Sequence, residues 1–195
     1  MMSPRPTRAG KVGLPPGSLV HVGRRLTEKT RLTLFTYDEE HLEERTIAAV
    51  GEAVPRRDWP GVTWLNIDGL QDTGVLAALG EAFGLHPLIL EDMLNTDQRP
   101  KFEDLGDYLF IVMRVFALPA HPKGGVHSEQ ISLVIGPHSL ITLQEKAGPL
   151  LDPIREGLRA GKGRIRKTGA DYLAHAIMDA VVDQYFVVLE ALGER

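Results

Sequence analysis

The sequence predicts an α/β domain with α+β-like character, in which a mixed sheet is layered between helices and is followed by the start of a long helix. Short segments with alternating or continuous apolar residues, typical of strands, occur at 31–38, 62–70 and 107–118. Segments with apolar residues at three- and four-residue steps, typical of helices, lie between and after them. Because both kinds of segment alternate along one chain, we expect them to share one sheet and one core.

The first part of the chain is predicted to hold three strands. Residues 18–23 (SLVHVG) and 31–38 (RLTLFTYD) alternate well enough to form two strands joined by a polar turn. Residues 38–47 are acidic and suggest a short helix, and residues 53–61, which contain two prolines, suggest a loop. Residues 62–70 (VTWLNIDGL) then form a compact third strand.

Two helices are predicted to follow the third strand. The segment 71–84 has the spacing of an amphipathic helix, carried by Val75, Leu76, Leu79 and Phe83. Gly84 suits the C-terminal cap of this helix. Pro87 is a favourable first-turn residue for the next helix, over 87–95.

The second half of the chain is predicted to alternate strands with longer helices. Residues 107–118 are apolar on both faces, as expected of a central strand covered by helices on each side. The remaining elements are a hairpin of 127–136 with 139–146, a helix over 149–161, a basic loop over 162–169 and the longest helix over 170–194.

Composition excludes several classes of protein. The chain has 195 residues, 43% apolar and 25% charged, with a formal net charge of -4, which suits one domain with a real core. The small acidic excess argues against nucleic acid or a membrane surface as the main partner. Absence of cysteine excludes disulfides, thiolate catalysis and Cys-ligated zinc. Residues 1–17 lack the apolar core of a signal peptide and are predicted to be a disordered leader.

Two adjacent carboxylates, Glu91 and Asp92, lie in the last turn of the predicted helix 87–95. Asp92 lies about 200° round the helix from Leu90, so it points away from the core. Acids in a last turn oppose the helix dipole by ~0.3–1 kcal/mol each. The simpler interpretation is that Arg99 and Lys101, or water, neutralise them.

The terminal helix also carries acids in an unfavourable arrangement. Asp179 and Asp183 are four residues apart on one face, a like-charge arrangement that costs a few tenths of a kcal/mol, roughly. The rest of this helix is apolar nearly all round, so it must be buried or packed against a partner. The two aspartates are either solvated or part of a divalent-cation site shared between separate segments. Mg²⁺ is typically bound by one or two carboxylates and retained waters, which suits so sparse a set.

Several long blocks occur in the order found in one family. The run TWLNIDGL…EAFGLHPLILEDMLNTDQRPKFE…DYLFIVMRVF, followed by SEQISLVI, ITLQEK and DPIREGLRAGKGRIRKTGADYLAHAIMDAVVDQYFVVLE, resembles the cytoplasmic domain of CorA-type magnesium/cobalt transporters. The likeness covers about residues 62–192.

The resemblance implies a homopentamer, a cytoplasmic α/β funnel and a very long stalk helix that enters the membrane. The family's Gly-Met-Asn selectivity motif does not occur in this sequence. We therefore expect a soluble fragment from the cytoplasmic face of the inner membrane, unable to transport ions itself. Residues 18–168 are the expected regulatory domain, and residues 169–195 the start of the stalk helix, whose transmembrane continuation is absent. As an isolated fragment, the chain is expected to be a monomer or weak oligomer that meets the membrane only through those missing helices.

The resemblance also implies a role for the acids. In the family, this domain senses intracellular Mg²⁺ through cations bound between protomers, and so gates the uptake of Mg²⁺ or Co²⁺. Asp92 corresponds to the principal acid of this sensor, and Glu91 and Asp179 to secondary ones, with a further acid expected beyond Arg195. Mg²⁺ is the expected regulatory ion, with Co²⁺, Ni²⁺ or Zn²⁺ as alternatives, and the chain is expected not to be an enzyme.

Three alternative functions agree less well with the sequence. A ZntB-type zinc transporter shares the architecture, but the LEDMLN-x-x-QRPK block favours the magnesium/cobalt type. A phosphate-binding enzyme is disfavoured because GLRAGKG (157–163) has three residues between its glycines, one fewer than a P-loop needs, and lacks Ser or Thr after the lysine. A nucleic-acid-binding module is disfavoured because no aromatic residue interrupts the basic run Arg155, Arg159, Lys162, Arg164, Arg166 and Lys167.

Overall fold

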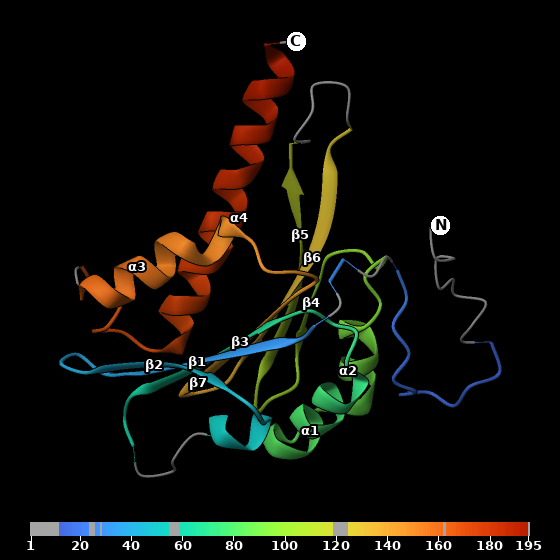
Figure 1. The fold of residues 1–195 in the computed structure, drawn as a ribbon, viewed down its shortest axis with the longest axis horizontal. Helices are drawn as coiled ribbons and strands as arrows, with labels where there is room; N and C mark the ends of the chain where they lie inside the picture. Colours follow the sequence, from blue (N-terminus) through green and yellow to red (C-terminus); the bar gives the residue numbers. More distant parts are fainter. Residues whose placement is uncertain are drawn as a thin grey trace.

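A mixed sheet with helices on both faces forms the body of the molecule (Figure 1). The computed structural model describes residues 12–23, 26–27, 29–54, 59–118, 125–161 and 163–194. Within these residues the sheet has seven strands in the order β2-β1-β3-β7-β6-β5-β4. All neighbouring strands pair antiparallel except β3 and β7, which are parallel.

The described elements have the following bounds. The strands are β1 (Arg31–Tyr37), β2 (Leu42–Ile47), β3 (Val62–Asp68), β4 (Lys101–Asp104), β5 (Leu109–Ala117), β6 (His127–Ile135) and β7 (Ser139–Gln144). The α-helices are α1 (Thr73–Phe83), α2 (Pro87–Met93), α3 (Asp152–Ala160) and α4 (Ala170–Gly193), and two short 3-10 helices are η2 (Val50–Ala53) and η3 (Pro149–Leu151).

The period-two alternation of the strands divides the core into two layers. On β3, Leu65 and Ile67 face a cluster that includes the buried sides of α1 and α2. Val62 and Trp64, on the opposite face of the same strand, join a cluster formed with α3 and α4. Two layers arise because successive side chains of a strand point to opposite faces of the sheet. The predicted fold class, a mixed sheet layered between helices, is therefore confirmed.

Local capping explains where the first two helices begin and end. The Asp72 carboxylate accepts hydrogen bonds from the backbone N–H groups of Gly74 and Val75 at the start of α1. Gly84 ends α1 in the left-handed conformation at φ 66°, as predicted for a glycine cap. His86 caps α2 by accepting from the Leu88 N–H, and Pro87 occupies the first turn.

Two of the element assignments made from the sequence are wrong, and one strand was not predicted. Residues 18–23 contain no strand, only an isolated bridge from Val22 to Asn95. The segment 38–47, predicted to be helical, contains β2, because a hairpin turn at Asp38 returns it onto β1. Strand β4 was not predicted, since its residues 101–104 are exposed in alternation and have little apolar character.

Strand β5 lies second from the edge of the sheet, between β6 and the short β4, and not at its centre as predicted. Its apolar residues are explained by packing on both faces, with Phe110 in one core layer and Ile111 against the other. The outer end of β5 packs against α4, where Phe116 and Tyr185 have ring centroids 5.4 Å apart. The Tyr185 hydroxyl donates to the Arg114 carbonyl at 2.5 Å.

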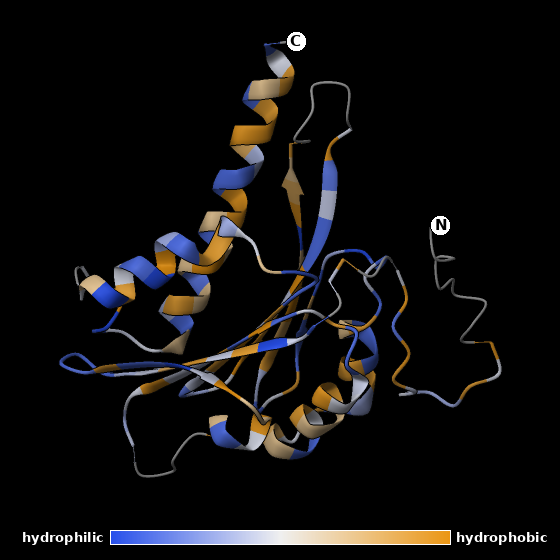
Figure 2. Cartoon of the chain, in the orientation of Figure 1, coloured by the Kyte–Doolittle hydropathy of each residue, from blue (hydrophilic) through white to orange (hydrophobic). Residues whose placement is uncertain are grey.

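Helix α4 confirms the predicted long terminal helix and changes character along its length. Its first half buries Leu173, Ala174, Ile177 and Val181 against the sheet. Its C-terminal part extends past the body of the domain and contains hydrophobic turns, drawn orange in Figure 2. The large apolar side chains exposed on this helix are Val182, Phe186, Val187, Leu189 and Leu192. Among the described residues, no helix combines the length and apolar character needed to cross a bilayer.

The predicted leader lies mostly outside the described residues, which begin at residue 12. Residues 12–17 have no helix or strand, and Gly17 contacts α2.

Candidate functional site

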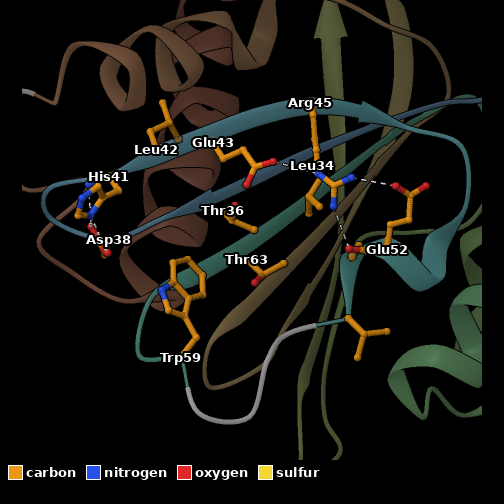
Figure 3. A pocket seen from close by; sticks show the side chains of 12 residues that line it. Leu34, Thr36, Asp38, His41, Leu42, Glu43, Arg45, Glu52, Trp59 and Thr63 are labelled. Atoms are coloured by element: carbon orange, nitrogen blue, oxygen red, sulfur yellow. Dashed lines mark hydrogen bonds and ion pairs between the residues drawn. The ribbon is translucent and has the colours of Figure 1, made fainter.

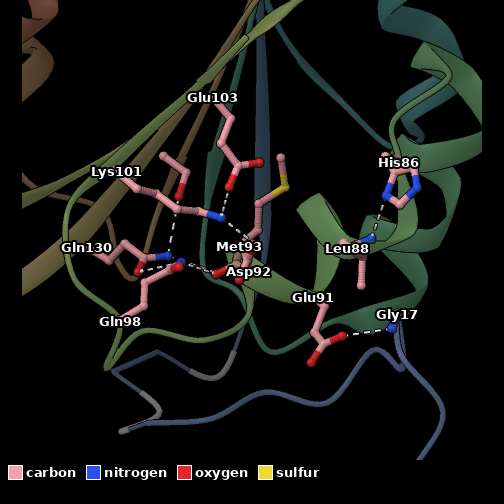
Figure 4. Close-up of polar contacts among 11 residues, drawn as sticks. Gly17, His86, Leu88, Glu91, Asp92, Met93, Gln98, Lys101, Glu103 and Gln130 are labelled. Atoms are coloured by element: carbon pink, nitrogen blue, oxygen red, sulfur yellow. Dashed lines mark hydrogen bonds and ion pairs between the residues drawn. The ribbon is translucent and has the colours of Figure 1, made fainter. Parts of the chain in front are cut away.

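Helix α2 presents the two acids predicted from the sequence at the edge of the first core layer. Ile89, Leu90 and Met93 are buried beneath the helix, which leaves Glu91 and Asp92 partly exposed on its outer side. Figure 4 shows the two carboxylates pointing to different neighbours, Asp92 towards β4 and Glu91 towards the chain segment before β1.

Asp92 is held by a lysine. The Lys101 Nζ lies 2.5 Å from Asp92 Oδ2 and 2.6 Å from Glu103 Oε1, and the side chains of Asp92 and Lys101 are 28% and 25% exposed. The Nζ atom also lies 5.3 Å from the centroid of the Phe110 ring. Burial by itself lowers the pKa of Lys101, but hydrogen bonds to Asp92 and Glu103 outweigh it and raise that pKa. The interpretation that Lys101 neutralises an acid of α2 is confirmed for Asp92.

Two glutamine amides satisfy the last carbonyls of α2. Gln98 Nε2 donates to the Asp92 carbonyl, and Gln130 Nε2 donates to the Met93 carbonyl at 3.1 Å. These donors come from the loop after α2 and from β6, so they cap the helix from outside its own sequence. The capping stabilises a helix end that the two acids would otherwise make less favourable.

Glu91 is held by the main chain of the segment that precedes β1. Its Oε2 accepts a hydrogen bond of 2.7 Å from the Gly17 N–H. Farther along this segment, the Val22 N–H donates to the Leu94 carbonyl at 2.9 Å, and the Thr96 N–H donates to the Val22 carbonyl at 3.0 Å. We call residues 17–23 the strap, because both ends of this segment are hydrogen-bonded to α2 or to the residues just after it.

Asp179 does not join the other two acids within one chain. It is exposed on α4, which packs in the second core layer, whereas α2 packs in the first. The sheet therefore separates Asp179 from Glu91 and Asp92. In the described part of the chain, no group of three or more His, Cys, Asp or Glu side chains is arranged to hold a metal ion.

Sequence reasoning missed Glu103 as a member of the charged group around Asp92. Lys101 and Glu103 are two residues apart in β4, so both project from the same face of the strand. The Lys-x-Glu spacing indicates that the two side chains share a face only if residues 101–104 form a strand, and the sequence did not predict that strand.

A separate cavity of about 410 Å³ lies against β1 and β2 beside Trp59 (Figure 3). Its ionisable side chains pair with one another: His41 with Asp38 at 3.2 Å, and Arg45 with Glu43 at 3.3 Å and Glu52 at 2.8 Å. The described ionisable side chains of this cavity therefore already have partners within it.

The basic run considered as a nucleic-acid surface is largely paired within the domain. Arg159 forms two hydrogen bonds of 2.7 Å to Glu44, Arg155 bonds Asp152 at 2.8 Å, and Lys167 pairs with Glu39 at 2.9 Å. Lys162 lies outside the described residues. Gly161 is the left-handed cap that ends α3, so the residues before it are helical and do not form a phosphate-binding loop.

The sequence matches known transporters over nearly its whole length. The profile described as "CorA-like Mg2+ transporter protein" matches residues 59–195. The cobalt/magnesium transport protein CorA of Thermotoga maritima is 41% identical over 187 residues, which cover 96% of this chain and 53% of that protein. The chain thus spans about half the length of this relative.

Solved structures share the fold at low sequence identity. The soluble domain of CorA from Methanocaldococcus jannaschii superposes with a TM-score of 0.63 at 14% identity, covering 84% of this chain and 60% of that one. The ZntB cytoplasmic domain from Vibrio parahaemolyticus gives a TM-score of 0.63 at 14% identity, covering 86% of this chain and 64% of that one. At this identity the likeness concerns the fold alone, and the fold is common to both types of transporter.

Proposed function

The chain belongs to the CorA-like Mg²⁺ transporter family, and on that premise we propose that it is the cytoplasmic, Mg²⁺-sensing domain of a divalent-cation transporter. In this proposal, the domain gates the uptake of Mg²⁺ or Co²⁺ by binding cations between subunits. The ion favours one arrangement of subunits because its site is complete only in that arrangement.

The observation that carries this proposal is the placement of the acids on two sides of the sheet. Glu91 and Asp92 are partly exposed on α2, and Asp179 is exposed on α4. A cation bound by acids from both helices must therefore lie between two copies of the chain. The family's homopentamer, proposed here for the full-length protein, would supply such contacts.

The chemistry of these side chains favours a hard cation. Carboxylate oxygens are the ligands that Mg²⁺ prefers, and partly exposed carboxylates let the ion keep several waters. Zinc and the later transition metals bind imidazole and thiolate more strongly, and the three acids supply neither. We therefore propose Mg²⁺ as the regulatory ion, with Co²⁺, Ni²⁺ or Zn²⁺ as alternatives.

The exposed apolar side chains of α4 support self-association. Phe186 and Leu189 are 59% and 61% exposed on the part of the helix that leaves the sheet. Large apolar side chains grouped on one helix mark a surface that another helix covers.

The test is the mass and melting temperature of the chain with Mg²⁺ and with a chelator, measured by light scattering and calorimetry. We expect Mg²⁺ to raise the mass or the melting temperature of the wild type. An ion present at about 100 times its Kd adds about 2.7 kcal/mol of stability. Asp92→Asn is expected to abolish the response, and Asp179→Asn to weaken it.

Asp107→Asn is the matched control, because Asp107 is exposed near β5 and the substitution removes the same charge. A Mg²⁺ response that survives Asp92→Asn unchanged, or is lost equally in the control, contradicts the role given to Asp92. No response in the wild type contradicts ion sensing by this chain.

A further inference from the structure

We propose that cation binding to the acids of α2 is an exchange, because both acids have internal donors and the Lys101 ammonium is a tethered competitor for Asp92. This inference rests on the proposed ion-sensing function, and adds to it the residue that sets the affinity of the site.

The Lys101 ammonium is paired with one of the two carboxylate oxygens that Asp92 could offer to a cation. Its Nζ is within 2.6 Å of carboxylate oxygens from Asp92 on α2 and Glu103 on β4. Charge-assisted hydrogen bonds of this length are about twice as strong as neutral ones. The Phe110 ring, 5.3 Å from Nζ, adds a weaker attraction for a cation. Figure 4 shows the lysine reaching between the two carboxylates.

A divalent cation cannot simply add to this group. Asp92 and Glu103 carry two negative charges and Lys101 one positive charge, so the three side chains together have a net charge of -1. An ion bound to Asp92 Oδ2 would be close to the ammonium and would be repelled by it. Because lysine has a flexible four-carbon stem and the Lys101 side chain is 25% exposed, the ammonium can move into water as the ion enters.

Glu91 is occupied in a second way, by the strap. The Gly17 N–H reaches Glu91 Oε2 because the backbone passes very close to α2. A Cβ at position 17 would lie 2.8 Å from the Pro87 Cβ, and Gly17 has φ +82°, so only glycine fits there without strain. The strap is also tied down through Val22 and Thr96. An ion that binds Glu91 through Oε2 competes with the hydrogen bond from Gly17.

The two internal partners differ in what their removal does. The strap donor is a neutral backbone group, whereas Lys101 carries a full charge of the same sign as the ion. Lys101 therefore opposes the ion at Asp92 directly, and it keeps the site from filling at low ion concentration. Removing its charge should make the ion bind more tightly, the opposite of what deleting a ligand would do.

The test is the Kd of Mn²⁺, read by electron paramagnetic resonance, and of Mg²⁺, read by calorimetry, at one ionic strength. Lys101→Met keeps the length and apolar stem of the side chain and removes the charge. We expect it to lower both Kd values by about tenfold, which equals in free energy a pKa shift of one unit. Lys101→Gln, which keeps a donor for Asp92 and Glu103, provides a second variant with the same expected direction.

Lys167→Met is the matched control. Lys167 pairs with Glu39 at 2.9 Å and is 56% exposed, so this variant has the same change in net charge at another ion pair. The Kd values of Mn²⁺ and Mg²⁺ for this variant should stay within about twofold of the wild-type values, because the charge of Lys167 is exposed and screened. Adding Asp92→Asn to Lys101→Met should abolish the gain in affinity.

The possible results distinguish the proposed exchange at Lys101 from the ion-sensing function on which it rests. If the wild type binds ions and both Lys101 variants bind no more tightly, the exchange is wrong and ion sensing stands. An equal gain in Lys167→Met would also overturn the exchange, because it would reflect net charge. If neither the wild type nor the Lys101 variants bind ions, the proposed function fails and the exchange falls with it.

Discussion

Replacing Glu145 with glutamine is expected to remove a pH dependence from the stability of this fold. Glu145 follows β7, is only 6% exposed, and accepts a hydrogen bond of 2.5 Å from the Gln130 N–H. Burial raises its pKa from 4.5 to about 7. The Gln130 hydrogen bond and Arg114 lower that pKa, and nearby Glu129 and Asp97 raise it, without reversing the effect of burial.

The sign and size of the effect follow from proton linkage. Below about pH 4.5, the carboxyl is protonated in both the folded and the unfolded chain, so it adds no pH dependence to the free energy of unfolding. Between about pH 4.5 and pH 7 the unfolded chain has released this proton and the folded chain still holds it. Stability therefore falls as pH rises through this window, by about 3 kcal/mol in total.

Glutamine keeps the size of the side chain and can still accept from the Gln130 N–H, but it does not titrate. We expect Glu145→Gln to match the wild type in stability near pH 4.5 and to exceed it by up to about 3 kcal/mol at pH 8. The assay is urea unfolding of both proteins at intervals from pH 4.5 to 8, with the free energy of unfolding extrapolated to water.

The informative quantity is the difference between the two proteins at each pH, because every other titrating group is common to both. A difference that stays constant across the range would refute the reasoning, since it would show that Glu145 does not hold its proton in the folded chain. A difference that grows in the opposite direction would show that the carboxylate is stabilised by Arg114 more than burial destabilises it.

Two further predictions concern the second core layer. Trp64→Phe removes the hydrogen bond of 2.9 Å from Trp64 Nε1 to Thr142 Oγ1 in a buried site, and should cost about 1–3 kcal/mol in urea unfolding; no loss would mean that water replaces the donor. Ile177→Ala, at a fully buried position of α4, should cost about 2–5 kcal/mol. The control is Leu189→Ala, because Leu189 is 61% exposed on the same helix, and it should change the stability of the monomer by less than about 0.5 kcal/mol. A similar loss of stability in Ile177→Ala and Leu189→Ala would show that Leu189 is covered in solution.

Local patterns in the sequence determined most of the elements of this fold. The helical spacing of Leu76 and Leu79, the Gly84 cap and Pro87 each act within a few residues, so the bounds of α1 and α2 could be predicted closely. The same is true of the β6–β7 hairpin, whose turn closes across three residues. These features depend on contacts between residues that are near one another in the chain.

Tertiary structure decided the elements that local patterns describe poorly. Residues 42–47 form a strand because β1 supplies its hydrogen-bond partners, although their acidic composition suggested a helix. The predicted strand 18–23 became the strap, since its Val22 bonds to the residues after α2 and not to a neighbouring strand. Both outcomes depend on pairings that the segment itself does not specify.

The same division applies to the candidate site. The sequence determined that Glu91 and Asp92 share the outer side of one helix, because the helical period alone places them there. Only the folded chain could show that Lys101 and Glu103 meet Asp92 and that the sheet separates Asp179 from both acids. Contacts across strands and layers depend on strand order and register, and neither is encoded in the spacing of residues along a single segment.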